Sequence, residues 1–173
     1  AGQATIAHEM LSQGADAAKA IVVPVGGGGL ISGIGCVLAE QKNPPALIGV
    51  LSEASPYFHA IYHLGTQDGV RESNSLADGL AGAVEPDSLT IPLVRRLVQD
   101  FILVSEDAIT QAIAYAWHKH GQVIEGSGAA ALAAALTGRV TERPAAVIIT
   151  GGNMDPQLHR EICNQWTGEE LFG

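Results

Sequence analysis

The residues that most clearly point to chemistry are four consecutive glycines, Gly26 to Gly29, which follow the apolar residues 22–25 and precede Leu30 and Ile31. Because glycines lack side chains, the backbone can turn tightly there and direct several N–H groups toward one point. The amino terminus of a helix beginning at this place adds partial positive charge. The pattern therefore predicts a site for an anion, best matched to a phosphate group.

Two familiar phosphate loops do not fit this run. A P-loop needs Gly-Lys-Ser/Thr, and no glycine of this chain is followed by lysine. A dinucleotide fingerprint needs glycines at relative positions 1, 3 and 6, but counting from Gly26 or Gly27 the sixth residue is Ile31 or Ser32. The remaining alternative is a tight turn without a ligand, which four glycines disfavour because each loses much backbone freedom on folding.

Apolar runs elsewhere in the chain predict the elements that hold this loop. They are Ala20–Val25, Ala46–Leu51, Phe101–Val104 and Ala145–Thr150. Each is apolar throughout rather than alternating, which is typical of parallel strands covered on both faces. Helical segments lie between them, one opened by Ser105 with Glu106 in its first turn and the last by Asp155 with Pro156. We predict one α/β domain over residues 1–173, an open, mostly parallel sheet in a three-layer (αβα) arrangement.

The stretch between the second and third predicted strands combines a helix with a long loop. Ser55 and Pro56 predict a helix start, with Ser55 as the N-cap and Pro56 at the first helical position, and Gly65 predicts its end. The following residues, 66–90, are rich in Gly, Ser, Asp and Asn and predict one irregular segment. Loops of that length are usually functional or mobile.

Composition limits the classes of function. The net charge of −9 disfavours nucleic acid and anionic membranes as partners. No apolar run approaches the roughly 20 residues that span a bilayer. The first five residues contain no signal sequence and no Met, which indicates a processed or truncated start. Cys36 and Cys163 lack metal-binding spacing and are interpreted as buried thiols of a cytoplasmic protein.

At this point the sequence resembles a known family. Residues 24–30, Pro-Val-Gly-Gly-Gly-Gly-Leu, are similar to the tetraglycine loop of fold-type II pyridoxal-phosphate (PLP) enzymes, in the branch of threonine dehydratases, serine dehydratases and serine racemases. Three further motifs follow in the family's order. They are Ser-Leu-Ala-Asp-Gly-Leu-Ala at 75–81, Glu-Gly-Ser-Gly-Ala-Ala-Ala at 125–131 and Thr-Gly-Gly-Asn-Met-Asp at 150–155. The resemblance covers nearly the whole chain and implies part of a fold-type II large domain.

The resemblance implies a role for each motif. Backbone amides would hold the PLP phosphate, from residues Gly26, Gly27, Gly28, Gly29 and Leu30. The Gly79 backbone and Glu125 would line the edge of the ring, and the Thr150 hydroxyl would bind the pyridine nitrogen. A neutral hydroxyl there leaves the ring a mild electron sink, which suits elimination at Cβ. Taken alone, Thr150 also fits a strand-end cap, Glu125 a helix N-terminal charge, and Asp78-Gly79 an ordinary turn.

The family's Schiff-base lysine and its substrate-carboxylate loop lie in earlier motifs that have no counterpart here. The lysines of this chain are Lys19, Lys42 and Lys119. All three are interpreted as solvated surface charges, so no catalytic residue is assigned. Some family members bind a divalent cation beside a glutamate that matches Glu53. Because the later acidic ligand of those members falls near Tyr57 or His59, no metal site is predicted.

The chain is therefore interpreted as the carboxy-terminal half of a threonine/serine dehydratase-like enzyme of amino-acid metabolism, inactive alone. A full member would convert threonine or serine into a 2-oxo acid and ammonia. The absent half would leave sheet edges and apolar surface, so we predict a homo-oligomer, most simply a dimer, or a complementing amino-terminal half. Two alternatives stay open: a non-catalytic module for a phosphate-bearing small molecule, and an oligomeric scaffold.

Overall fold

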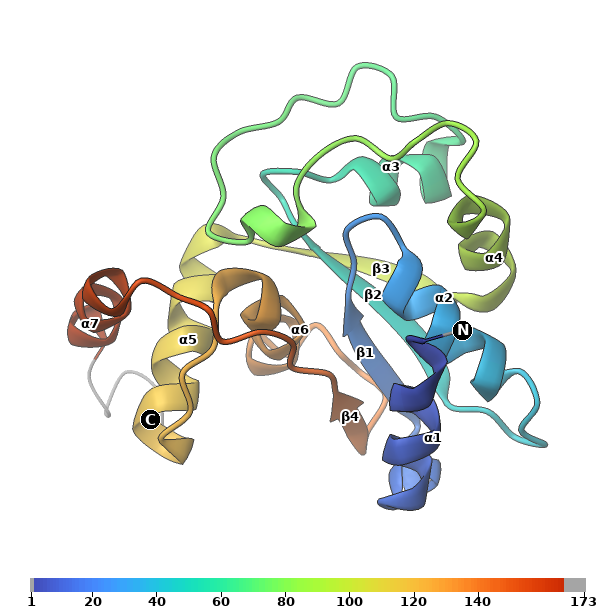
Figure 1. The fold of residues 1–173 in the computed structure, drawn as a ribbon, viewed down its shortest axis with the longest axis horizontal. Coiled ribbons are helices and arrows are strands. Elements are labelled where there is room, and N and C mark those ends of the chain that lie inside the picture. Colours follow the sequence, from blue (N-terminus) through green and yellow to red (C-terminus); the bar gives the residue numbers. More distant parts are fainter. Residues whose placement is uncertain (1, 167–173) are drawn as a thin grey trace.

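A parallel sheet of four strands forms the centre of the computed structural model, which describes residues 2–166 (Figure 1). The strands are β1 (Ala20–Pro24), β2 (Ala46–Ser52), β3 (Asp100–Val104) and β4 (Ala145–Val147), and they lie in the order β3-β2-β1-β4. All three pairings are parallel. The predicted α/β class and the four predicted strands are confirmed, although β4 ends three residues earlier than the apolar run.

Helices cover both faces of the sheet, as predicted. They are α1 (Ala4–Ser12), α2 (Gly29–Leu38), α3 (Tyr57–Leu64), α4 (Thr90–Leu97), α5 (Glu106–His120), α6 (Gly126–Leu136) and α7 (Pro156–Gln165). Short 3-10 turns, η1 (Ala15–Ala17) and η2 (Asp78–Leu80), complete the set. In Figure 1, α1 and α2 lie on one side of the sheet and α5 and α6 on the other. No helix within residues 2–166 is long and apolar enough to cross a bilayer.

The core is divided by the sheet into two clusters, and alternate residues of β1 point into each. Ala20 and Val22 pack with residues of α5 and α6, whereas Ile21 and Val23 pack with residues of α1 and α2. Both sets are buried because both faces are covered. Burial on both faces explains why the strands appear in the sequence as unbroken apolar runs.

Two helix starts differ from expectation. Helix α3 begins at Tyr57 with Pro56 at the N-cap, one residue later than predicted. The hydroxyl of Ser55 does not cap the helix, because it donates to Glu72 Oε1 at 2.7 Å. Helix α4 was not predicted. Pro92 lies in its first turn, where a missing N–H is tolerated. The side chain of Val94, on the inner face of the helix, is fully buried.

The close contact between β2 and Phe101 gives a prediction for stability. A Cβ built at Gly49 would lie 2.3 Å from Cε1 of the Phe101 ring. Because that ring is 5% exposed and packs against Phe58, it has little room to move. We expect Gly49→Ala to lower the free energy of unfolding by about 1–2 kcal/mol, measured by urea denaturation. An unchanged midpoint, relative to Gly2→Ala as control, would contradict this packing; a Cβ at Gly2 meets nothing within 4 Å.

Candidate active site

The glycine loop connects the carboxyl end of β1 to the first turn of α2. Gly28 has φ +79°, a left-handed conformation, and a Cβ there would lie 2.6 Å from Cε2 of Phe58. This glycine is therefore required both by the turn and by packing. Gly27 and Gly29 are different, because both are exposed and a Cβ at either would meet nothing within 4 Å. The outer side of the loop is thus open to a ligand.

The amides of this loop have the pattern expected of an anion site. On either side of it the backbone is paired: Val25 N donates to Val50 O at 2.8 Å, and Ser32 N donates to Gly28 O at 3.0 Å. Between them, the N–H groups of residues 26–31 have no acceptor within residues 2–166. A run of unpaired donors at a helix amino terminus matches the oxygens of a phosphate group.

Thr90, the first residue of α4, fixes one carbonyl of the loop. Its hydroxyl donates to Gly27 O at 2.7 Å and lies 2.7 Å from Ser88 Oγ. Because this bond joins the Gly27 carbonyl to α4, it fixes the orientation of the peptide group between Gly27 and Gly28. Sequence reasoning missed Thr90, which is separated from Gly27 by 63 residues and stands at the end of an irregular segment.

The Asp78-Gly79 segment lies directly against the glycine loop. A Cβ at Gly26 would lie 3.2 Å from Leu80 Cα and 3.3 Å from Gly79 O. The N–H of Gly79 donates to Ser127 Oγ at 2.9 Å, which joins the segment to the first turn of α6. The structure therefore brings Gly79 and the glycine loop together, as the resemblance implied. Ser127, within the Glu-led motif, is a further contributor that sequence reasoning did not single out.

Glu125 and Thr150 lie on opposite sides of a tight backbone contact. Glu125 N donates to Gly151 O at 3.3 Å, and a Cβ at Gly128 would lie 1.8 Å from Thr150 O. The Glu125 side chain makes no capping bond to α6. Within residues 2–166, the Thr150 hydroxyl also has no hydrogen-bond partner. Glu125 is the N-cap residue of α6, so the alternative of a helix N-terminal charge stays open beside a role at a ligand, and its carboxylate lies against Gly151, where a Cβ would be 2.0 Å from Oε1. The alternative of a cap by Thr150 has no such support.

These segments gather at one edge of the sheet because the strands are parallel. The glycine loop follows β1, and Thr150 follows β4, which is the neighbour of β1. Ligands of open α/β sheets bind outside the carboxyl ends of the strands. Contacts from Gly26 to Gly79, from Gly79 to Ser127 and from Gly128 to Thr150 make the edge continuous.

The lysines lie away from this edge. Lys19 directly precedes β1, and Lys42 lies between α2 and β2, so both are at the amino ends of strands. Lys119 is in the last turn of α5, whose first turn follows the carboxyl end of β3. A helix of 15 residues is about 22 Å long, which separates Lys119 from that edge. All three side chains are exposed, as predicted.

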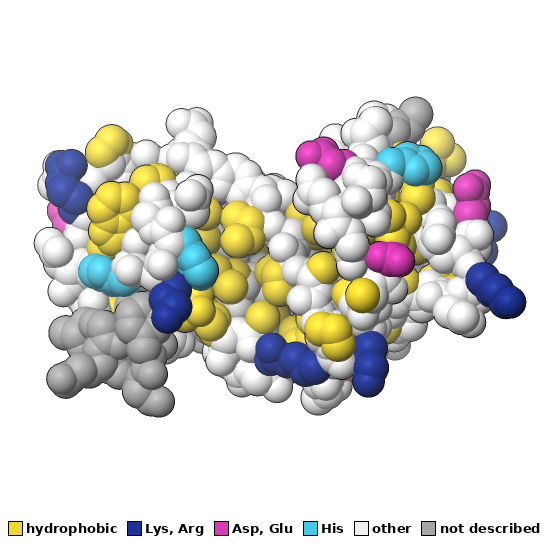
Figure 2. All heavy atoms as spheres, turned by 90° about the horizontal axis from the view of Figure 1, so that it is seen from below, with side chains coloured by type: hydrophobic (Ala, Val, Ile, Leu, Met, Phe, Trp, Pro, Cys, Tyr) yellow, Lys and Arg dark blue, Asp and Glu magenta, His cyan; other side chains and the backbone are white. Residues whose placement is uncertain are grey.

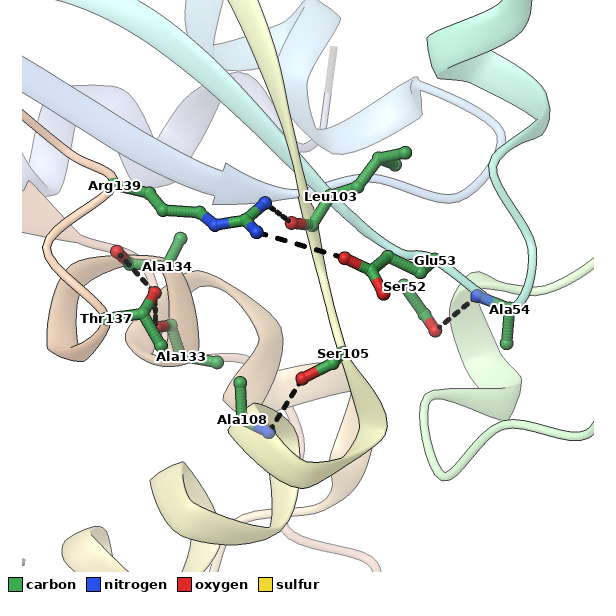
Figure 3. A network of polar contacts seen from close by, with 10 residues as sticks. All are labelled: Ser52, Glu53, Ala54, Leu103, Ser105, Ala108, Ala133, Ala134, Thr137 and Arg139. Carbon is green, nitrogen blue, oxygen red and sulfur yellow. Dashed lines mark hydrogen bonds and ion pairs between the residues drawn. The ribbon is translucent and has the colours of Figure 1, made fainter.

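Glu53 belongs to a different set of contacts, at the ends of β2 and β3 (Figure 3). Arg139 donates from Nη1 to Leu103 O at 2.5 Å, and its Nη2 lies 3.9 Å from Glu53 Oε1. Nearby, Ser105 Oγ accepts from Ala108 N at 3.2 Å and caps α5 as predicted. Within the described part of the chain, no three His, Cys, Asp or Glu side chains are grouped to hold a metal ion.

Comparison with known proteins agrees with this geometry. A family model described as pyridoxal-phosphate dependent enzyme matches residues 1–151. An L-threonine ammonia-lyase of Thermotoga maritima is 36% identical over an alignment of 176 positions, which covers 99% of this chain and 43% of that protein. A serine racemase of Dictyostelium discoideum is 33% identical over 95% of this chain and 52% of its own length.

Solved structures show the same relationship. The processed form of threonine deaminase isoform 2 from Solanum lycopersicum superposes with a TM-score of 0.83 at 28% identity, over 94% of this chain and 48% of that one. Maize serine racemase gives a TM-score of 0.81 at 29% identity, over 95% and 52%. The chain thus spans about half the length of the relatives it matches. It belongs to the family of pyridoxal-phosphate-dependent enzymes, with threonine dehydratases and serine racemases among its relatives.

Proposed function

We propose that this chain is the cofactor-binding half of a threonine/serine dehydratase-like enzyme and that PLP is its ligand. The observation that carries the proposal is the run of unpaired amides over residues 26–31 at the amino terminus of α2, inside the part that matches the family. PLP has a single phosphate group, which such a site would hold by backbone donors despite the chain's net charge of −9.

Each residue at the carboxyl edge of the sheet then has a proposed role in binding PLP. The amides of residues 26–30 bind the phosphate, and Thr90 keeps the Gly27 carbonyl turned to α4. The Thr150 hydroxyl donates to the pyridine nitrogen, while Glu125 and the Gly79 backbone border the ring. When bound, PLP supplies an electron sink for the negative charge that develops at Cα of an amino acid. A hydroxyl at the nitrogen keeps that sink mild, which suits loss of a β-hydroxyl from threonine or serine.

The chain alone is proposed to be inactive. A Schiff-base lysine must reach the cofactor, and the lysines of this chain are at the opposite end of the sheet. We propose that this group comes from a complementing amino-terminal half, since the relatives are about twice as long.

The outer edge of β4 is the surface proposed to contact this amino-terminal half or a second copy of the chain. Strand β4 ends the sheet, and a groove beside it is lined by Met10, Gly14 and Pro144. Ile149, just after the strand, is 48% exposed. Figure 2 shows apolar side chains along the hollow between the two lobes of the molecule. Light scattering after size exclusion is expected to give a dimer of the isolated chain, and a monomer would favour the complementing half.

Titration of the purified chain with PLP tests the proposed function. We expect saturable binding, competed by inorganic phosphate and not reproduced by pyridoxal, which lacks the phosphate. After borohydride reduction, mass spectrometry should find no specific adduct, because no lysine lies near the site. An adduct on one lysine would show that the chain supplies its own Schiff base. Absence of binding would favour the alternative of an oligomeric scaffold.

A further inference from the structure

A carboxylate in the first turn of α5 makes contacts that the helix itself does not need. Glu106 Oε1 accepts from Ser52 Oγ at 2.6 Å and from Ser75 Oγ at 2.7 Å, and its Oε2 accepts from Leu76 N at 2.7 Å. Both oxygens are therefore used, and each partner lies at least 30 residues away in sequence. The cap of α5 is provided separately, by Ser105.

Glu106 and its partners Ser52, Ser75 and Leu76 form a cluster, and one of these partners belongs to the sheet. Ser52 is the last residue of β2, and it is 1% exposed. Its Oγ also accepts from Ala54 N at 3.0 Å, so its position is fixed from two directions. Glu106 is thus joined to the rigid centre of the molecule. Hydrogen bonds to an ionised carboxylate are stronger than those between neutral groups.

The other side of the cluster leads to the glycine loop. Ser75 Oγ accepts from Ala77 N at 3.0 Å, which shapes the turn that follows Leu76. The carbonyl of Leu76 packs on Gly126, where a Cβ would be 2.1 Å from the oxygen. Two residues beyond Ala77, Gly79 is bonded to Ser127 and lies against Gly26. Residues 75–80 therefore form a wall between α6 and the glycine loop, held at its start by Glu106.

We infer that Glu106 is a positioning residue, which sets the affinity of the site for its phosphate ligand by holding the wall of residues 75–80 against the glycine loop. The effect on the ligand rests on the proposed function; the effect on the wall does not. Without the carboxylate, the Leu76 N–H and two hydroxyls lose their acceptor, and residues 75–80 move away from Gly26. Donors left without a partner at this partly buried position are costly, so the wall is expected to open locally.

Asp107 offers a matched control for Glu106. Both are acids of the first turn of α5, so Glu106→Ala and Asp107→Ala each remove one negative charge from the same helix end. Asp107 is exposed, and its side chain makes no hydrogen bond or ion pair with residues 75–80. Glu106→Gln adds a conservative variant, because its amide oxygen can still accept from Leu76 N while the serine hydroxyls turn to accept from its NH₂.

Amide hydrogen exchange, followed by mass spectrometry, measures how often residues 75–80 open in the chain without any ligand. Glu106→Ala is expected to speed exchange over residues 75–80 by about tenfold or more, with exchange in β1 unchanged, and to raise the Kd for PLP about tenfold. Asp107→Ala should do neither, and Glu106→Gln should lie between. If wild type binds no PLP, the proposed function fails, and the exchange result still decides the role of Glu106.

Two results would overturn the inference. One is an exchange rate over residues 75–80 in Glu106→Ala that equals the rate in the wild-type chain. The other is equal effects from Asp107→Ala, which would indicate a general charge effect at the helix end. If Glu106→Ala does not fold, Ser75→Ala removes only the hydroxyl on the wall side. It is expected to speed exchange in the same residues by a smaller factor, because the bond from Leu76 N to Glu106 Oε2 remains. Unchanged exchange there would show that the hydrogen bond between Ser75 and Glu106 does not hold the wall.

Discussion

A chain with Gly29→Ala is expected to fold at least as stably as wild type and to bind PLP at least about tenfold more weakly. Gly29 begins α2, and a Cβ there meets nothing within 4 Å, so the folded chain has no clash. The new methyl group would stand in the open space beside the unpaired amides. A phosphate bound by backbone donors needs close approach to the chain, which is the reason for glycine at such loops.

Isothermal calorimetry with PLP and urea denaturation together test this first expectation. Gly27→Ala should behave in the same way, because its Cβ also projects into open space. Gly2→Ala is the control, since it makes the same chemical change at another open position outside the loop. Wild-type affinity in both loop variants would show that the ligand does not lie against this loop.

Gly128→Ala is expected to have the largest effect on stability, a loss of about 2–3 kcal/mol in the free energy of unfolding. Its Cβ would lie 1.8 Å from Thr150 O and 2.9 Å from Gly151 O, both of which are backbone atoms. Residues of α6 are buried between the sheet and α5, so the helix cannot yield. Alanine favours the helix by about 1 kcal/mol over glycine, which offsets only part of the clash.

This second expectation also has a consequence for the ligand. Moving Thr150 away from α6 would displace its hydroxyl from the position proposed for it at the ring nitrogen, so PLP affinity should fall as well. Gly29→Ala is the matched comparison, because it is also a glycine-to-alanine change in a helix but has room for the methyl. Equal urea midpoints for the two variants would mean that residues 150–151 do not pack on α6 as described.

Local sequence patterns predicted the sheet and the turn from β1 into α2 well. The four strands are buried on both faces, and such strands are recognisable from apolar residues alone. The loop could be interpreted as an anion site because its chemistry is in the backbone, which needs no distant partner. Helix α4 was missed because Pro92 suggests a break, whereas the first turn of a helix accepts it.

Contacts between distant residues could not be predicted in this way. Glu106 looked like a charge for the helix dipole, yet its partner Ser52 is 54 residues away. The segment 66–90 was expected to be functional or mobile, and the structure shows it bonded to itself and to the core. Gln67 pairs with Val84 through both ends of its amide, at 2.7 and 2.9 Å. Nothing in the composition of a Gly- and Ser-rich loop reveals such bonds.

The place of β4 has a consequence for how the chain is made. β1 is paired on one side by β2, which follows it closely, and on the other by β4, which begins 125 residues after β1 does. During synthesis, β1 therefore remains an open edge until residues 145–147 have left the ribosome. An apolar edge strand is a template for association with other chains. The nascent chain is thus exposed to misassembly at this edge from the emergence of β1 until β4 has paired with it.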